Sequence, residues 1–425
     1  MPRSDRAGYA STQLDRTFAP ARTIAVLGPT TGLDADAVRA ALTAARTASP
    51  TSRIALDPRA DQRIWAYRDD IAGGIAVTDR PDLPTDDLGE LMNLVRDRGG
   101  PRLALEVVLC GDYVAVDYSH GVGDGQFGVL LLAVAAADPD GGLAPTLAPA
   151  LPSDATRRAL WRHYRENPRA LRDLRRVRAE HARPDTADDG VPTRTVDNWA
   201  KTKTCRAEFM TPEVSAALEA WAREHAPGAT AASVTVALVN AALRAEQVVL
   251  DDHVMILFNC RRYLAEEDRT GHGNFAIGIP VRIGAGATPG LVATVMKDVI
   301  DSGWPLAVLG VAGAKSALTR HRAAPAADDA GPITVPDRLR LAVSDLGNVT
   351  SLYRHLHFAD DGRPAQMTAT LEPDGPDGIT VLVSRLNKGR TLAATFCADM
   401  IDPDVVTRAL RRACLDPVAL LRHGV

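Results

Sequence analysis

The sequence predicts an α/β fold, an α+β sandwich divided into two lobes, and three observations support this prediction. The chain has 425 residues, of which 46% are hydrophobic, and this is enough for two sizeable cores. Short strand-like segments alternate with helical segments, and some strands are close enough in sequence to pair as hairpins. The segment PDTADDGVP at residues 184–192 has the composition of a flexible linker. We therefore expect an N-terminal lobe at residues 1–184 and a C-terminal lobe at residues 193–425.

The composition narrows the class of protein. The formal net charge is −4, and this mild acidity argues against nucleic acid as the main partner. The first residues lack the apolar core of a signal peptide, and no apolar run is long enough to cross a bilayer. We therefore expect a cytoplasmic protein without a membrane span.

No metal site is expected. The five cysteines are scattered without a Cys-x-x-Cys pair, so reduced structural thiols fit the sequence better than a zinc site or a disulfide framework. His355 and His357 would lie on one face of a strand, but no third ligand is near them in sequence.

Strand and helix signals alternate through the N-terminal half. Helices are expected to start after Asp34 or Asp36 and after Asp86 or Asp87, because an Asp side chain can accept from the free N–H groups of a first helical turn. The second of these helices ends at Gly99-Gly100-Pro101. Strands are expected at residues 23–27, 53–56 and 63–67, with a hairpin at residues 103–109 and 113–118.

The C-terminal half repeats this style. Thr211 is a helix cap followed by Pro212 at the first helical position, and Pro227-Gly228 separates this helix from a more apolar one. Helices are expected at residues 212–225, 230–247, 291–300 and 404–414. Strands are expected at residues 204–210, 254–258 and 338–343, and the segments 366–372, 379–384 and 391–397 are expected to form a late antiparallel meander.

The stretch at residues 154–183 is helical and strongly basic, with ten arginines. One interpretation is a solvated helix that crosses between the lobes. The other is a surface for an acidic carrier protein or for the phosphates of coenzyme A.

The stretch at residues 114–137, VAVDYSHGVGDGQFGVLLLAVAAA, is where we expect catalysis. Alternating apolar residues predict a strand that ends just before residue 120, and a helix is expected from about Gln126 to Ala137, with the apolar run Phe127–Ala137. Between them, HGVGDG contains three glycines, which let the backbone turn sharply off the strand. His120 would then lie at the rim of a sheet beside a helix N-terminus, where developing negative charge is stabilised.

Spacing alone does not single out His120, because His-x-x-x-Asp also occurs at His181/Asp185 and His357/Asp361. Those two lie beside Pro or in turn-like segments, and we interpret them as solvated loop residues. Only the first follows an apolar strand and precedes an apolar helix. The alternative interpretation of His120 is a strand-end side chain that only satisfies a backbone carbonyl.

The motif around His120 resembles that of a known family. SHGVGDG is similar to the His-x-x-x-Asp-Gly motif of the acyltransferase superfamily related to chloramphenicol acetyltransferase. That superfamily includes the condensation domains of non-ribosomal peptide synthetases, the polyketide-associated acyltransferases and the plant-type CoA-dependent acyltransferases. Many members carry a second His before the catalytic one, where this chain has Ser119.

Two further segments carry the resemblance. NCRRYL at residues 259–264 and GHGNF at residues 271–275 resemble the Asn-x-Arg … Gly-Asn arrangement of the plant-type branch. SDLGN at residues 344–348 resembles in part the Ser-Asn-x-Gly segment of condensation domains and the Asp-Phe-Gly-Trp-Gly segment of the plant-type enzymes.

The resemblance implies two chloramphenicol-acetyltransferase-like lobes that form a pseudo-dimer with a central channel, and His120 near its middle. It implies that Asp124 forms a structural salt bridge with Arg261. A triad role for Asp124 is disfavoured because its carboxylate, across the Gly-rich turn, would point away from the imidazole. Asn259 and Asn274 are expected to brace turns between the lobes.

His120 has the chemistry of a general base, because unperturbed imidazole titrates near ~6.5. It could deprotonate a hydroxyl or amine that attacks a thioester carbonyl, and then protonate the leaving thiolate. No Gly-x-Ser-x-Gly elbow is present, so direct transfer is favoured over an acyl-enzyme. Oxyanion donors are expected at the Gly125 N–H and, from its motif match, at Ser344, although Ser344 could instead belong to a strand-end turn.

These inferences predict an acyltransferase that forms an ester or amide on a small-molecule hydroxyl or amine, and the resemblance implies a place in specialised metabolism. The expected co-substrate is acyl-CoA or a phosphopantetheinyl thioester on an acyl or peptidyl carrier protein, and no bound cofactor is expected. Two alternatives stay open. One is a non-catalytic condensation-like module that recruits a carrier protein or partner enzyme, and the other is an epimerase- or cyclase-type relative with the same motif.

Overall fold

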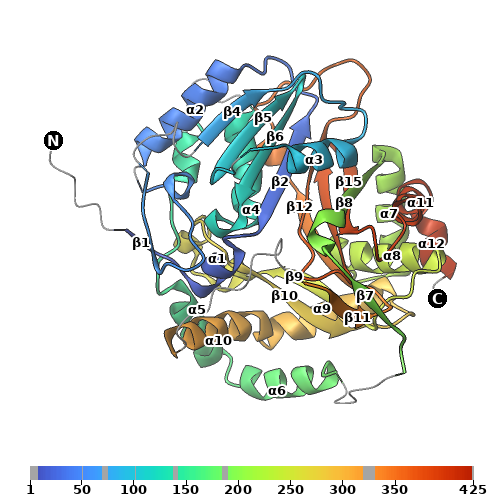
Figure 1. The fold of residues 1–425 in the computed structure, drawn as a ribbon. Helices are drawn as coiled ribbons and strands as arrows, with labels where there is room; N and C mark the ends of the chain where they lie inside the picture. Colours follow the sequence, from blue (N-terminus) through green and yellow to red (C-terminus); the bar gives the residue numbers. More distant parts are fainter. Residues whose placement is uncertain are drawn as a thin grey trace.

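The protein is built on two main β-sheets with helices packed on both, as the computed structural model shows (Figure 1). The structure describes residues 8–49, 51–68, 75–100, 102–136, 142–183, 190–318 and 331–423. Most of the predicted linker, residues 184–189, lies outside them. No helix of the described residues is both long and apolar enough to cross a membrane.

The first sheet has five strands in the order β13-β2-β6-β5-β4. Its strands are β2 (Arg22–Gly28), β4 (Ile75–Asp79), β5 (Leu105–Cys110), β6 (Tyr113–Ser119) and β13 (Gln366–Ala369). The predicted hairpin is confirmed, because β5 and β6 pair antiparallel around Cys110 and Tyr113. Helices α2 (Ala35–Ala48) and α4 (Gly125–Ala135) cover one face, and α3 (Leu88–Asp97) covers the other.

Strand β2 shows why this sheet is buried on both faces. Ala25 and Leu27 belong to the core cluster that includes α2 and α4, whereas Ile24 and Val26 belong to the cluster around α3. Successive side chains of a strand point to opposite faces, so a run of apolar residues serves two cores. The helices begin where the sequence predicts, since Asp34 caps α2 and Asp87 caps α3.

The second sheet has six strands in the order β10-β9-β12-β14-β15-β8. Its strands are β8 (Lys203–Met210), β9 (His253–Asn259), β10 (Ala276–Arg282), β12 (Arg340–Asn348), β14 (Gly378–Leu386) and β15 (Gly389–Cys397). The helices in contact with its outer face or packed beside it are α7 (Pro212–His225), α8 (Ala231–Ala245), α9 (Pro289–Asp301), α11 (Pro403–Leu415) and α12 (Pro417–His423).

The inner face of this second sheet packs against the first half of the molecule. In β14, Val381 and Val383 belong to the core under α7, α8 and α11, whereas Leu382 and Leu386 belong to the cluster that contains α4. Helix α3 also contacts β8 at the sheet edge. The two sheets are therefore joined by apolar packing, and the α4 side of that junction is where the cavity described below lies.

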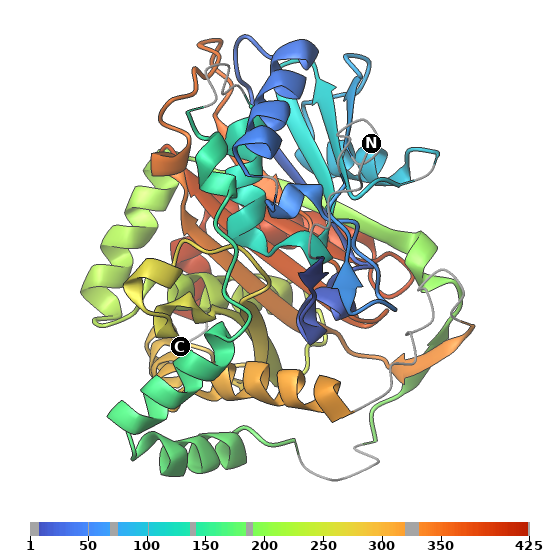
Figure 2. The ribbon, with the colours of Figure 1, turned by 90° about the vertical axis from the view of Figure 1, so that its left-hand side faces the viewer.

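The remaining elements surround this junction. Near the N-terminus are β1 (Tyr9–Ala10), α1 (Gln13–Phe18) and β3 (Ile64–Trp65), and the lower part of the molecule holds α5 (Ala155–Glu166), α6 (Ala170–Glu180) and α10 (Trp304–Leu318) (Figure 2). A separate ribbon pairs β7 (Thr193–Val196) with β11 (Ile333–Pro336). The short 3₁₀ turns are η1 (Arg53–Ala55), η2 (His120–Val122), η3 (Ala144–Leu147), η4 (Trp199–Thr202), η5 (Cys260–Tyr263), η6 (Glu266–Asp268) and η8 (Thr350–Leu352).

Three local predictions are wrong. Residues 53–55, predicted as strand, form η1, because Arg53 is a buried charged residue that turns inward to meet several oxygens. Residues 366–369 do not join the late meander but pair with β2 of the first sheet, so only β14 and β15 remain as its hairpin. Ser344 lies inside β12 and not beyond its end.

The predicted division at residues 184–193 stays a prediction. Two facts bear on it: β13 crosses from the C-terminal half into the first sheet, and α5 and α6 contact α10 and α9.

Candidate active site

A cavity of about 460 Å³ lies between α4 and the inner face of the second sheet. Ligand cavities of proteins have this order of volume. Much of its wall is apolar, with Val129 and Leu130 from α4 and Leu257 and Ile277 from β9 and β10. The predicted site residues that line it are His120, Asp124, Gly125, Asn259, Arg261 and Ser344.

His120 enters this cavity from a tight turn that joins β6 to α4. Its backbone N–H donates to the carbonyl of Ala21 at 2.8 Å, which keeps the turn beside β2. Ser119 donates from its hydroxyl to the Ala19 carbonyl at 2.7 Å and accepts from the Gly121 N–H. The His120 ring lies 4.7 Å from the ring of Phe18, centroid to centroid. The hydrogen bonds hold the backbone of the turn, and the Phe18 ring packs against the imidazole.

The glycines of the turn are needed because neighbouring atoms lie too close for a side chain, and not because the backbone angles are unusual. None of Gly121, Gly123 and Gly125 lies in the left-handed region, and Gly123, with φ 174°, is in extended backbone that any residue adopts, so the predicted reason for them is wrong. A Cβ on Gly121 would lie 2.9 Å from both the Cα of Ala19 and the backbone oxygen of Asp15. The turn can pack against α1 only because that side chain is absent.

Asp124 and Arg261 form the expected ion pair. Oδ2 of Asp124 lies 2.6 Å from Nη1 of Arg261, and it also accepts from the backbone N–H of Phe275 at 3.0 Å. The other guanidinium nitrogens of Arg261 donate to the carbonyls of Gly271 and Gly273. Both side chains are buried. The pair therefore joins the His120 turn to the segment that follows β9.

Because Asp124 pairs with Arg261, its side chain does not cap the N–H groups at the start of α4. Asp124 is the N-cap residue of α4, but its side chain does not accept from the N–H groups of the first turn. Gly125, whose N–H begins that turn, lines the cavity. A helix N-terminus with free N–H groups can stabilise an anionic oxygen.

The two asparagines differ in role. Asn259 accepts from the Arg261 N–H at 3.0 Å and braces the η5 turn locally, so the expected role between the lobes stays a prediction. Asn274 does more, because its Oδ1 lies 3.1 Å from Nδ1 of His120 while its Nδ2 donates to the His120 carbonyl at 2.9 Å. The Gly-Asn pair in the sequence marked this residue, but its contact with a histidine 154 positions away is visible only in the fold.

Ser344 lies on β12 opposite Leu382 of β14 and faces the same cavity as His120. Its neighbour Asp345 is already engaged, since it accepts from the Thr235 hydroxyl and from the Gly347 N–H. The Ser344 hydroxyl forms no hydrogen bond within the described part of the chain, so it is available to a bound molecule.

The environment of His120 favours the neutral ring. Burial lowers the pKa of the imidazole, and the opposing effects of its own backbone carbonyl, Asp124, Asn274 and Asp15 are smaller. A neutral imidazole at physiological pH can accept a proton.

No thiol is placed to act as a nucleophile. All five cysteines are free and buried. Burial raises the pKa of Cys110 and of Cys260 to about 12 and that of Cys205 to about 11. The thiolate is the reactive form of cysteine, so these three thiols are poor nucleophiles, and none of the five cysteines lines the cavity.

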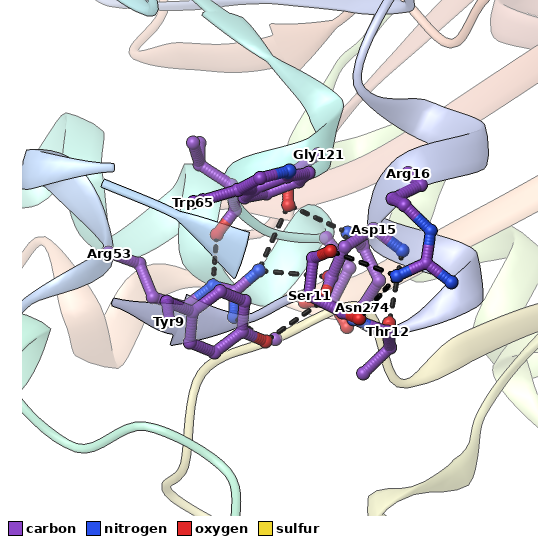
Figure 3. Close-up of polar contacts among 12 residues, drawn as sticks. Tyr9, Ser11, Thr12, Asp15, Arg16, Arg53, Trp65, Gly121 and Asn274 are labelled. Atoms are coloured by element: carbon purple, nitrogen blue, oxygen red, sulfur yellow. Dashed lines mark hydrogen bonds and ion pairs between the residues drawn. The ribbon is translucent and has the colours of Figure 1, made fainter. Parts of the chain in front are cut away.

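Sequence reasoning missed the residues behind His120. Asp15 and Arg53 form a buried ion pair next to Asn274, and Tyr9 hydrogen-bonds to both (Figure 3). Asp15 is the N3 residue of a capping box with Thr12, a local signal that identifies a helix start but not a link to the site.

Sequence comparison finds neither a family model nor a curated protein that matches. Solved structures do match along the whole chain. The condensation domain of the monacolin K polyketide synthase superposes with a TM-score of 0.60 at 15% identity, over 99% of this chain and 97% of that one. The chain has the condensation-domain fold. The two-lobed architecture expected from the motif resemblance is therefore confirmed.

Two other solved structures that match this chain have different activities in their names. A trichothecene 15-O-acetyltransferase from Fusarium sporotrichioides has a TM-score of 0.57 at 12% identity, over 98% of this chain and 94% of that one. The epimerization domain from the third module of tyrocidine synthetase B has a TM-score of 0.58 at 14% identity, over 98% of each chain. Because one fold serves several reactions, the function has to be argued from the site.

Proposed function

We propose that this protein transfers an acyl group from a thioester to a hydroxyl or amine, with His120 as the general base. The observation that carries the proposal is the placement of His120: a largely neutral imidazole, engaged through Nδ1, at the wall of a cavity of about 460 Å³. The thioester would be carried by coenzyme A or by the phosphopantetheine arm of an acyl or peptidyl carrier protein.

The residues of the cavity account for each step. Nε2 of His120 takes the proton of the acceptor as its oxygen or nitrogen attacks the thioester carbonyl. The negative charge on the former carbonyl oxygen is stabilised by the Gly125 N–H and the Ser344 hydroxyl. Collapse of the intermediate breaks the C–S bond, and His120 returns the proton to the leaving thiolate. The products are an ester or amide and a free thiol.

The test compares wild type with His120→Ala and with the control His357→Ala, whose exposed side chain lies outside the cavity. Each protein is incubated with a panel of acyl-CoA and acyl-carrier thioesters and with hydroxyl and amine acceptors, and products and intact protein are measured by mass spectrometry. We expect transfer by wild type and His357→Ala, and loss in folded His120→Ala. A wild-type protein that becomes covalently acylated during turnover would contradict the direct mechanism.

Recruitment of a carrier protein is a second candidate, because α6 presents an unusual cationic surface. Arg169, Arg172, Arg175 and Arg178 are exposed and form no ion pair within the described residues. Binding of a carrier protein by both wild type and His120→Ala, without any turnover of the thioester panel, would favour this function. The epimerase-type alternative is tested in the same experiment, because chiral analysis of the recovered acyl groups detects an epimerase activity.

A further inference from the structure

A buried polar network around Asp15 of α1, drawn in Figure 3, reaches Asn274, and Asn274 in turn contacts His120. Asp15 and Arg53 form an ion pair with Oδ1 and Nη2 2.9 Å apart, and their side chains are 0% and 2% exposed. Arg53 also donates to the carbonyls of Gly121 and Val122, in the turn that carries His120. Asn274 lies between this pair and the histidine. A buried charge pair with all its hydrogen bonds satisfied restricts the positions of the groups around it.

The surroundings of Asn274 permit one orientation of its amide. One end of the amide lies 3.0 Å from Oδ1 of Asp15, 2.9 Å from the His120 carbonyl and 3.2 Å from the Gly121 carbonyl. All three are acceptors, so this end must be the NH₂ group. The opposite end is therefore the oxygen, which can only accept.

Asp15 is held in the form that this orientation needs. Burial opposes ionisation, but the Arg53 guanidinium, the Thr12 N–H and the Asn274 amide keep the pKa of the Asp15 carboxyl below its ordinary range. Its second oxygen accepts from the Thr12 N–H at 2.9 Å and from the Tyr9 hydroxyl at 2.8 Å. An ionised carboxylate has no proton to donate, so Asn274 faces a permanent acceptor.

The orientation of Asn274 then bears directly on where His120 carries its proton, beside the backbone carbonyl of His120 itself, which also favours a protonated ring nitrogen. Nδ1 of His120 lies 3.1 Å from Oδ1 of Asn274, and two acceptors cannot share a hydrogen bond. Nδ1 must therefore be the protonated nitrogen of the neutral ring, and Nε2 keeps its lone pair.

We infer that Asp15 and Asn274 are positioning residues: the Asp15 carboxylate orients the Asn274 amide, and the amide fixes His120 as the tautomer with its proton on Nδ1. The inference rests on the proposed function only for the use of Nε2 as the base. The tautomer itself is a property of the protein without substrate.

The direct test is a two-bond ¹⁵N–¹H correlation spectrum of the full chain with ¹⁵N-labelled histidine, recorded well above the pH at which His120 titrates. The His120 signals are assigned by their loss in His120→Gln. We expect a protonated Nδ1 and an unprotonated Nε2 in wild type. A wild-type spectrum with the proton on Nε2 overturns the inference.

Variants separate the two positioning residues from the rest of the network. Asn274→Ala removes the side-chain acceptor of the His120 ring, and in Asp15→Asn either orientation of the new amide sets a donor against the Thr12 N–H or against Asn274. Both should give a mixture of tautomers. Tyr9→Phe is the matched control, because it removes hydrogen bonds to Asp15 and Arg53 but leaves the Asp15–Asn274 contact in place. It should keep the wild-type spectrum.

The outcomes are distinct. A folded Asn274→Ala or Asp15→Asn with the wild-type tautomer overturns the inference. If Asp15→Asn does not fold, Asp15→Glu, which keeps the charge opposite Arg53 but displaces the carboxylate, replaces it under the same criterion. Where turnover is measurable, kcat should fall about 10²-fold in Asn274→Ala with little change in KM, as expected for a misplaced base. An inert wild type with the Nδ1-protonated ring contradicts the proposed function and supports the positioning role.

Discussion

The Asp124 carboxylate lies 2.6 Å from the Arg261 guanidinium, whereas the imidazole of His120, four residues before it, meets the side chain of Asn274 instead. The His-x-x-x-Asp spacing of the motif therefore joins a catalytic candidate to a structural residue. The ion pair connects the turn after β6 with the segment after β9, so it couples the two sheets at the cavity.

Asp124→Ala should destabilise the protein. Removal of one partner leaves the Arg261 charge buried and unpaired, which costs about 3–5 kcal/mol of unfolding free energy. Urea unfolding followed by circular dichroism measures this loss. In a double-mutant cycle with Arg261→Ala, the second substitution should cost much less once the first is present. A variant that kept its stability and lost only activity would contradict a structural role.

The pH dependence of kcat/KM should follow His120. Protonation removes the base, and burial lowers the pKa of this imidazole, so the loss of activity on acidification should occur below the ordinary histidine value of about 6.5. The measurement is kcat/KM from pH 4.5 to 9 with a single thioester and acceptor. An acidic limb centred above the ordinary value would count against His120 as the group that titrates.

The sequence predicts best where the signal is local. The strand that leads to His120 and the helix that follows it were predicted because a two-residue period changes to an apolar helical run within one stretch. Asp34, Asp87 and Thr211 mark helix starts because each caps its own first turn.

Non-local relationships could not be predicted. The segment Gln366–Ala369 has the composition of any strand, and nothing within it indicates that β2, more than 300 residues earlier, is its partner. The burial of Arg53 could not be predicted either, because a buried arginine depends on the oxygens that the fold brings to it. Of the candidate site, the sequence pointed to His120 and its turn, and the motif resemblance implied the Asp124–Arg261 pair, whereas the link from Asp15 through Asn274 exists only after folding.

Ser344→Ala should lower kcat without loss of stability. The hydroxyl lines the cavity and forms no hydrogen bond within the described residues, so its removal leaves no buried partner unsatisfied. Loss of a donor to the oxyanion lowers kcat by about 10²-fold or more. Steady-state kinetics on Ser344→Ala and on Ser344→Thr, which keeps a hydroxyl, measures the effect. Full kcat in folded Ser344→Ala would remove this residue from the mechanism.

Gly121→Ala should disturb the turn that carries His120. The new Cβ would lie 2.9 Å from the Cα of Ala19 and from the backbone oxygen of Asp15, and backbone atoms cannot move aside as a flexible side chain can. We expect a loss of about 1–3 kcal/mol of unfolding free energy, the usual cost of overpacking, together with reduced kcat as the imidazole shifts. Gly99→Ala is the matched control, because nothing lies within 4 Å of a Cβ at that position and its φ is not positive. Thermal unfolding and kcat are measured on both variants. Equal thermal stability and equal kcat of the two variants would contradict close packing of α1 against the turn, and with it the role of the N-terminal helix in supporting the site.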